Sequence, residues 1–212
     1  MTDENIALRR LIEERLKDTR APTDWGAAVF PGTSQPLDPA LRQYFPAAPI
    51  AAAVLVPIIE HEDELSVLLT RRASHLKNHA GQISFPGGRI ESSDEGAAAA
   101  ALREAKEEIG LPPEHVTLAG YLDPQLLISG FWVTPVVGFV RPGFTLELDP
   151  REVETTFEVP LRHILDPANH LARERKLGSA TVHVYDIPYG EHRIWGATAA
   201  MLISLYKLIT SG

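Results

Sequence analysis

The sequence contains no cysteine, which excludes a disulfide framework and any metal site built on thiolates. It also lacks an apolar run of the ~18 residues that a membrane-spanning helix needs. The first ten residues, MTDENIALRR, carry no apolar core of the kind found in a signal peptide. From these absences we expect a cytoplasmic protein that does not associate with a membrane.

Positive charge is also scarce. The chain has 20 Lys and Arg residues against 28 Asp and Glu residues, which gives a formal net charge of −8. This balance disfavours nonspecific binding of a polynucleotide, because such binding depends on neutralising backbone phosphates. A small phosphorylated substrate remains compatible, since a local group of cations can outweigh the overall charge. We therefore expect a small-molecule partner and no nucleic acid.

The composition is that of one globular domain with extensions. Of the 212 residues, 44% are hydrophobic and 23% are charged. Apolar residues at helical spacing predict a helix over residues 5–18 that packs on the domain or on a second subunit, as in a homodimer. A Pro-rich connector over residues 21–49 is predicted to be an irregular covering segment. We therefore divide the chain into an N-terminal segment of residues 1–45 and a main domain of residues 46–212.

An alanine-rich stretch predicts the main functional helix. Five consecutive alanines precede the run Leu-Arg-Glu-Ala-Lys-Glu-Glu-Ile-Gly, and most of these residues favour helix. Ser92, Ser93 and Asp94 offer oxygens for an N-cap, and Gly110 stands where a helix would end. The predicted helix runs from Asp94 to Ile109.

Glu104, Glu107 and Glu108 fall on one face of this helix, within an arc of about 100°. The simplest interpretation is a solvated acidic face. However, Lys106 is the only base inside the cluster, and Gly87 and Gly88 precede the helix, where backbone can approach a ligand closely. Carboxylate oxygens beside such a turn suit Mg²⁺ or Mn²⁺, which can in turn hold phosphate oxygens.

The stretch FPGGRIESSDEGAAAAALREAKEEIGL resembles the box of the Nudix hydrolases. It departs from the usual pattern in one respect. Counting forward from Gly88 places the first acidic residue of the box at Asp94, whereas counting back from Arg103 places it at Glu95, so the loop is one residue longer. The resemblance implies an α/β/α sandwich with a mixed central sheet, here with added N- and C-terminal helices. It also implies hydrolysis of nucleoside diphosphates linked to another group.

The resemblance further implies the roles of individual residues. Glu104, Glu107 and Glu108, with the backbone carbonyl of Gly87, would bind the divalent ions, and Arg103 would orient the carboxylates. In the family, a glutamate downstream of the box often completes the metal shell or serves as general base. Glu152 is the first candidate for this role, and Glu154 is the second.

A second resemblance lies upstream, in the segment from Leu68 to Gly88. Leu-Leu-Thr-x-Arg-Ala, then a base, then a glycine before Phe-Pro-Gly-Gly is similar to the signature of the coenzyme A pyrophosphatase branch. Arg71, Arg72 and Lys77 would contact substrate phosphates or the pantetheine arm, together with the Gly87–Gly88 turn; a solvated basic loop is the simpler alternative. Lys77 stands where arginine is expected, which keeps the charge but loses the planar fork of donors.

The branch implies a metal-dependent enzyme that cleaves coenzyme A or acyl-CoA, giving 3′,5′-ADP and 4′-phosphopantetheine or its acylated form. ADP-ribose, NADH or a nucleoside triphosphate are alternative substrates. A non-catalytic nucleotide sensor is a further alternative, against which the complete set of box glutamates counts.

Elsewhere the sequence predicts ordinary elements of such a domain. Phe131 and Trp132 are expected to be core or pocket aromatics, and His183 is expected at a polar surface rather than on a metal. Strands are predicted over residues 50–59, 65–70, 117–122, 131–140, 145–148 and 181–187, and further helices over residues 161–165 and 194–209.

Overall fold

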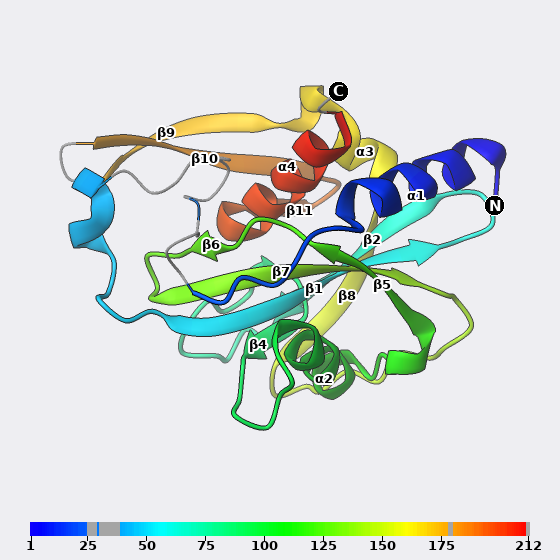
Figure 1. The fold of residues 1–212 in the computed structure, drawn as a ribbon, viewed down its shortest axis with the longest axis horizontal. Helices are drawn as coiled ribbons and strands as arrows, with labels where there is room; N and C mark the ends of the chain where they lie inside the picture. The colour runs from blue at the N-terminus through cyan, green and yellow to red at the C-terminus, as the bar shows by residue number, and fades with distance from the viewer. Residues whose placement is uncertain (25–28, 30–38, 178–179, 211–212) are drawn as a thin grey trace.

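The computed structural model describes residues 1–24, 29, 39–177 and 180–210 of the chain. Within these ranges, a mixed eight-stranded sheet forms the centre of the molecule, and a three-stranded antiparallel sheet lies beside it (Figure 1). The main sheet follows the order β3-β2-β1-β7-β5, with β4 paired to β1, β6 to β7 and β8 to β2. The small sheet follows the order β11-β10-β9.

The central pair of the main sheet is parallel, and its other pairs are antiparallel. The main sheet comprises β1 (Ile50–Glu60), β2 (Leu65–Arg72), β3 (Ile83–Ser84), β4 (Gly87–Arg89), β5 (Val116–Tyr121), β6 (Gln125–Leu126), β7 (Phe131–Val140) and β8 (Val153–Pro160). The small sheet comprises β9 (Leu171–Leu177), β10 (Ala180–Tyr189) and β11 (His192–Trp195). The parallel partners are β1 and β7, which are buried along most of their length.

Helices cover both faces of the main sheet, which confirms the predicted α/β/α sandwich with added terminal helices. In Figure 1, α2 lies on one side of the sheet, and α1, α3 and α4 lie on the other. The helices are α1 (Asp3–Leu16), α2 (Ala97–Ile109), α3 (Leu161–Leu165) and α4 (Gly196–Thr210), with short 3-10 turns η2 (Pro39–Tyr44), η3 (Pro113–His115) and η4 (Pro167–Asn169). No helix in the described ranges has the length and hydropathy to cross a membrane.

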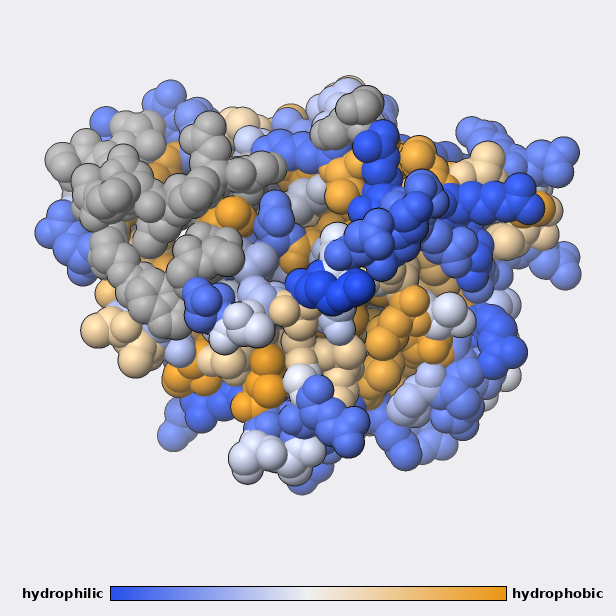
Figure 2. Space-filling model, in the orientation of Figure 1, coloured by the Kyte–Doolittle hydropathy of each residue, from blue (hydrophilic) through white to orange (hydrophobic). Residues whose placement is uncertain are grey.

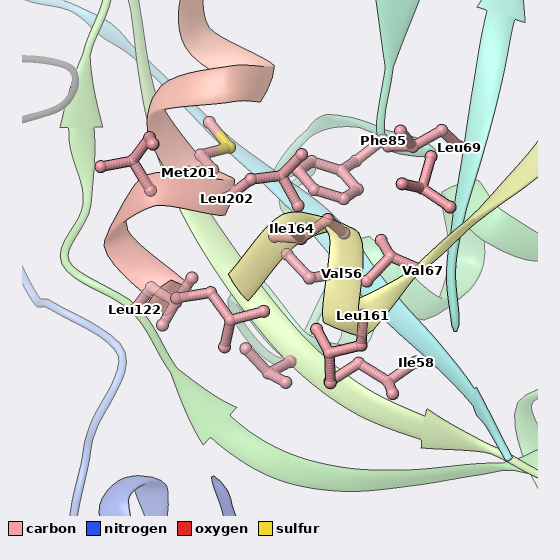
Figure 3. Close-up of a cluster of buried hydrophobic side chains, with 14 of the residues drawn as sticks. Val56, Ile58, Val67, Leu69, Phe85, Leu122, Leu161, Ile164, Met201 and Leu202 are labelled. Atoms are coloured by element: carbon pink, nitrogen blue, oxygen red, sulfur yellow. The ribbon is translucent and has the colours of Figure 1, made fainter. Parts of the chain in front are cut away.

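Alternation along β1 supplies two hydrophobic cores, one on each face of the sheet. Val56 and Ile58 point into the core that α4 covers, together with Met201 and Leu202 (Figure 3). Residues of opposite parity, such as Leu55, point into the core beneath α2. Because side chains alternate across a strand, one apolar run can serve both layers, and burial of both layers stabilises the sandwich.

The N-terminal helix packs on its own domain. Its residues Ile12 and Leu16 are fully buried in the larger core, while the outer surface of α1 is hydrophilic (Figure 2). Much of the predicted Pro-rich connector, residues 25–28 and 30–38, lies outside the described residues. The division of the chain at residue 46 therefore stays a prediction.

Several predicted elements are confirmed, including the strands over 50–59, 65–70 and 131–140 and the helix over 161–165. The predicted strand over 145–148 is wrong. This segment crosses the end of α2 instead, where the backbone N–H of Glu147 donates to Ile109 O at 3.0 Å and that of Asp149 donates to Glu108 O at 2.9 Å. Its donors are thus used to satisfy the helix end, which leaves fewer for a sheet.

The C-terminal helix begins two residues later than predicted. Ile194 and Trp195 belong to β11, where they pair with Ile187 and Asp186 of β10. Gly196 follows with φ +65°, a left-handed conformation that separates the strand from α4.

Candidate active site

Small side chains bring α2 close to the sheet. Ala100, Ala101 and Ala105 are almost completely buried and pack with Ala53 and Leu55 of β1. Short side chains allow the helix axis to approach the strands, so the residues of its last turns lie beside β4. The contact places the predicted acidic residues next to Gly87 and Gly88, which follow the bend at Pro86 and begin β4; we call this pair the glycine turn.

The start of α2 differs from the prediction. Gly96 precedes the first helical residue, Ala97, and no side chain caps this end, so the predicted start at Asp94 is three residues too early. The Asp94 carboxylate binds Arg103 instead of a helix N–H. Gly110 ends the helix in the left-handed region, as predicted, with φ +69°.

The two glycines allow contact between backbone and carboxylates. The Gly87 N–H donates to Glu108 Oε2 at 3.3 Å. A Cβ on Gly88 would lie 2.4 Å from Glu104 Oε1, and one on Gly87 would lie 2.4 Å from Ala53 O. Because real Cβ atoms do not approach other atoms so closely, only glycine fits at these positions without movement of its neighbours.

Arg103 connects the acidic residues to the loop before the helix. Its Nε and Nη2 atoms each lie 3.0 Å from an oxygen of Asp94. Its Nη1 donates to Glu104 Oε1 at 2.9 Å and to Glu107 Oε2 at 3.2 Å, and Nη2 also donates to Arg89 O at 3.1 Å. This pairing lowers the pKa of Asp94. One guanidinium therefore holds the loop and two of the box glutamates.

Glu108 is buried, and it forms no ion pair with any residue that the structure describes. Burial raises its pKa to about 8, and the negative charge of Glu152 adds to the shift, while the Gly87 N–H and the Arg72 guanidinium oppose it. Burial likewise raises the pKa of Glu104, although the hydrogen bond from Arg103 lowers it. Both carboxylates would thus gain from a nearby positive charge.

A cavity of about 920 Å³ opens beside these residues. Glu104, Glu152 and the Gly87–Gly88 turn line one part of it, with Arg72 close by. The remaining wall is largely apolar and includes Leu127, Ile128, Phe131, Val133, Val182 and Val184. Phe131 thus lies at the pocket, whereas Trp132 is buried in the core, as expected for both aromatics.

The donors at the acidic end fit a hard divalent cation in their chemistry. In the described part of the chain, no three Asp, Glu or His side chains are already gathered as a ligand set. Glu107 in particular is turned to Arg103 with its side chain 59% exposed. Glu104 and Glu108 lie beside Gly88 and Gly87, and burial raises the pKa of both carboxylates, although Arg103 pairs with Glu104. Oxygen donors whose ionised form is disfavoured by burial would gain from Mg²⁺ or Mn²⁺, once the Glu107 side chain rotates toward them.

The predicted phosphate-binding bases are separated by the structure. Arg72 is half-buried and lines the cavity, and its Nε has no hydrogen-bond partner among the described residues. Arg71 is exposed and lies 3.9 Å from Glu154 Oε2. Lys77 is also exposed, and neither Arg71 nor Lys77 lines the cavity.

The two downstream glutamates are also separated. Glu152 lines the cavity and is close enough to raise the pKa of both Glu104 and Glu108. Glu154 instead lies beside Arg71. Of the two candidates, Glu152 is therefore the one beside the acidic site.

Sequence reasoning missed the basic residues that line the far wall of the cavity. Arg173 and Arg175 come from β9 and Arg193 from β11. The alternation of Arg173 with Arg175 was a signal for a strand with one basic face, but β9 itself was not predicted. His183 is exposed on β10, as expected, and it also lines the cavity.

A family model described as the NUDIX domain matches residues 49–178. The chain belongs to the Nudix family. The match spans the strands that flank the site, the glycine turn, the acidic helix and Glu152. The protein is thus a Nudix hydrolase, an enzyme that acts on the pyrophosphate of nucleoside diphosphate derivatives, in a family that generally uses divalent cations.

Relatives with the same domain support this assignment. The chain is 40% identical over 154 residues to "Uncharacterized Nudix hydrolase NudL" of Enterobacter sp. (strain 638), which covers 73% of this chain and 80% of the relative. It is 41% identical over 158 residues to the protein of the same name from Photorhabdus laumondii, with coverage of 74% and 84%. A MutT/nudix family protein from Enterococcus faecalis shares the fold at 16% identity and a TM-score of 0.50, covering 84% of this chain and 66% of that structure.

Proposed function

We propose that this Nudix hydrolase cleaves the pyrophosphate bridge of coenzyme A or acyl-CoA, releasing 3′,5′-ADP and 4′-phosphopantetheine or its acylated form. The observation that carries the proposal is that acidic residues, arginines and a long apolar wall line one cavity of about 920 Å³. Coenzyme A combines a triply phosphorylated nucleotide with a long, mostly uncharged arm. Such a substrate can use both kinds of wall, whereas a nucleoside triphosphate has no comparable arm to place against the apolar one.

The segment that resembles the coenzyme A branch lies next to this cavity. Within it, Arg72 reaches the cavity, and β3 and the glycine turn follow directly in the sequence. Arg72 has a buried nitrogen with no partner among the described residues, and a buried donor is costly unless it is bonded. A substrate phosphate or carbonyl oxygen would supply that partner.

We assign the carboxylates and Gly87 to binding Mg²⁺ or Mn²⁺. Glu104, Glu107, Glu108 and the Gly87 carbonyl would hold the ions, which when bound neutralise the phosphates and lower the pKa of an attacking water. Glu152 would accept the proton from that water, because it lines the cavity beside the acidic site. Arg103 would keep Glu104 and Glu107 oriented.

A substrate panel tests the proposal. Purified protein with Mg²⁺ or Mn²⁺ is incubated separately with coenzyme A, acetyl-CoA, ADP-ribose, NADH and a nucleoside triphosphate, and the products are identified by mass. We expect 3′,5′-ADP with 4′-phosphopantetheine or its acetylated form, and slower cleavage of the other compounds. If coenzyme A and acetyl-CoA stay intact while another compound is cleaved, the assignment of the substrate is wrong.

Two variants test whether the acidic site is responsible for the hydrolysis. Glu108→Gln removes one proposed ligand with little change of shape, and we expect its turnover to fall by orders of magnitude. Glu114→Gln changes an exposed glutamate on η3 and should leave turnover unchanged. Near-normal turnover of Glu108→Gln would contradict the proposed metal site.

A further inference from the structure

The wall of the cavity formed by the small sheet is basic. In the registers of this sheet, Arg175 lies opposite Val182, Arg173 opposite Val184, and Asp186 opposite Trp195. Residues directly opposite each other in a sheet, and residues two apart in a strand, share a face. One face of the sheet therefore carries Arg173 and Arg175 from β9 and Arg193 from β11, and all three line the cavity.

Asp186 fixes two of these arginines. Arg193 donates to its carboxylate from Nε at 3.1 Å and from Nη2 at 2.9 and 3.1 Å, and Arg173 Nε lies 2.7 Å from Oδ2. Asp186 is only 2% exposed, whereas the side chains of Arg173 and Arg193 are 57% and 56% exposed. Their guanidinium groups are thus held in place and still accessible from the cavity.

Among the described residues, cations outnumber carboxylates in this cluster. Asp186 is the carboxylate that pairs with Arg173 and Arg193, and Arg175 adds a third cation on the same face. Each guanidinium has five N–H donors, and the contacts with Asp186 use only part of them. Planar forks of this kind match phosphate oxygens, and the charged hydrogen bonds so formed are strong.

We propose that Arg173, Arg175 and Arg193 form a subsite for a phosphate monoester of the substrate that is distinct from its pyrophosphate. Trp195 lies next to it, with its ring centroid 5.5 Å from Arg193 Cζ, and is 40% exposed. Arg193 thus lies over one face of a partly exposed ring, and such a ring beside a phosphate site suits a phosphorylated nucleoside, whose base can stack on it. The inference rests on the proposed function, under which this group is the 3′-phosphate of coenzyme A.

The subsite predicts which nucleotide the protein binds without metal ions. The two ends of the cavity differ, because carboxylates repel phosphate unless a cation intervenes, whereas arginines bind it directly. We therefore titrate the full-length protein with 3′,5′-ADP and with AMP in EDTA, using calorimetry. The two ligands differ only in the 3′-phosphate, and we expect 3′,5′-ADP to bind about tenfold more tightly.

Two variants test whether these arginines cause the preference for 3′,5′-ADP over AMP. Arg175→Gln and Arg193→Gln should reduce the preference for 3′,5′-ADP to about twofold or less without weakening the binding of AMP. Arg10→Gln, which changes an exposed arginine of α1, is the matched control and should keep the preference. Arg175 makes no contact with Asp186 that the structure shows, so its variant serves if Arg193→Gln fails to fold.

Three results would overturn the inference: equal affinities for the two nucleotides, no measurable binding of 3′,5′-ADP, or an unchanged preference in folded Arg175→Gln. None of these measurements depends on hydrolysis. If the protein did not cleave coenzyme A, the proposed function would be wrong, but the binding measurements would still test the subsite.

Discussion

Single residues of the acidic site are positioned by contacts between carboxylates and backbone. Gly87 and Gly88 are adjacent, but an added methyl group would meet different atoms at each of them. At Gly87 it would meet the backbone of Ala53 and Val54, whereas at Gly88 it would meet the carboxylate of Glu104. Backbone atoms of a central strand cannot move easily, but the end of a glutamate side chain can.

Alanine substitutions should therefore separate stability from activity. We expect Gly87→Ala to destabilise the fold, because the sheet itself must shift. Gly88→Ala should fold normally but lose about 10²-fold in turnover, because it displaces a proposed ligand by an ångström or so. Thermal unfolding and initial rates check the pair. Full activity of folded Gly88→Ala would show that the position of Glu104 does not matter.

The raised pKa of Glu108 predicts how the metal-free protein responds to pH. Folding raises this pKa from 4.5 to about 8, so folding favours the protonated form. The group's contribution to stability is complete below pH 4.5 and is lost as the pH rises through about 8. In EDTA, wild-type protein should thus lose stability between about pH 4.5 and pH 8, with no further loss from this group at higher pH.

Glu108→Gln removes this titration. We expect its free energy of unfolding to depend less on pH over the same interval, whereas Glu114→Gln should behave like the wild type. Denaturant unfolding at several pH values measures the difference. Identical pH profiles for Glu108→Gln and wild type would show that Glu108 ionises normally.

At the scale of elements, the end of α2 is the most constrained junction near the site. Gly110 has φ +69°, and a Cβ there would lie 2.8 Å from the backbone nitrogen of Glu147. That nitrogen donates to Ile109 O. The helix end and the segment that crosses it are therefore fixed together.

Two glycines that share a positive φ test this junction. Gly190→Ala introduces strain at φ +56°, but no atom lies within 4 Å of the new Cβ, so it should cost about 1 kcal/mol. Gly110→Ala adds a collision to similar strain and should cost more, with a melting temperature lower by several degrees. Thermal unfolding compares the two variants. Equal decreases in melting temperature would show that the segment around Glu147 moves away from the new Cβ at no measurable cost.

Elements whose pattern is local could be predicted from the sequence, and those defined by distant partners could not. β1 and β7 are continuous apolar runs because both of their faces are buried. β9 reads Leu-Ala-Arg-Glu-Arg-Lys-Leu, with no apolar face, and depends on its pairing with β10. β8 depends likewise on β2, which lies far away in the sequence.

The same distinction applies to the site. The glutamates of α2 and the glycine turn are close in the sequence, so the acidic end of the cavity could be predicted. The basic wall could not, because the tertiary fold brings β9 and β11 to a cavity whose acidic end lies some 70 to 90 residues earlier in the chain. Arg71 and Lys77 are predicted to bind phosphate because they belong to a short basic segment that resembles the branch signature, but neither lines the cavity.

For the whole molecule, one end of the cavity has carboxylates whose ionised form is disfavoured by burial, and the other end has arginines, two of which share Asp186. Divalent ions should therefore stabilise the folded protein by mass action. At 100 times the dissociation constant the gain is about 2.7 kcal/mol, or about 5–10 °C for a chain of this length.

Thermal unfolding with Mg²⁺ or Mn²⁺, against EDTA, measures this gain. We expect a clear shift for wild type and for Glu114→Gln, and a much smaller one for Glu108→Gln. If neither ion shifts the melting temperature of wild-type protein, the acidic end is no cation site.

Arg103 should affect how tightly such an ion binds. Its guanidinium already serves Asp94, Glu104 and Glu107 together, so it compensates their charge before any ion arrives. Capture of a metal by Glu107 is then a competition between two cations for the same oxygens. Removing the Arg103 guanidinium would therefore raise the affinity for the metal. It would also remove the hydrogen bonds to Asp94 and to the Arg89 carbonyl that hold the loop against the helix.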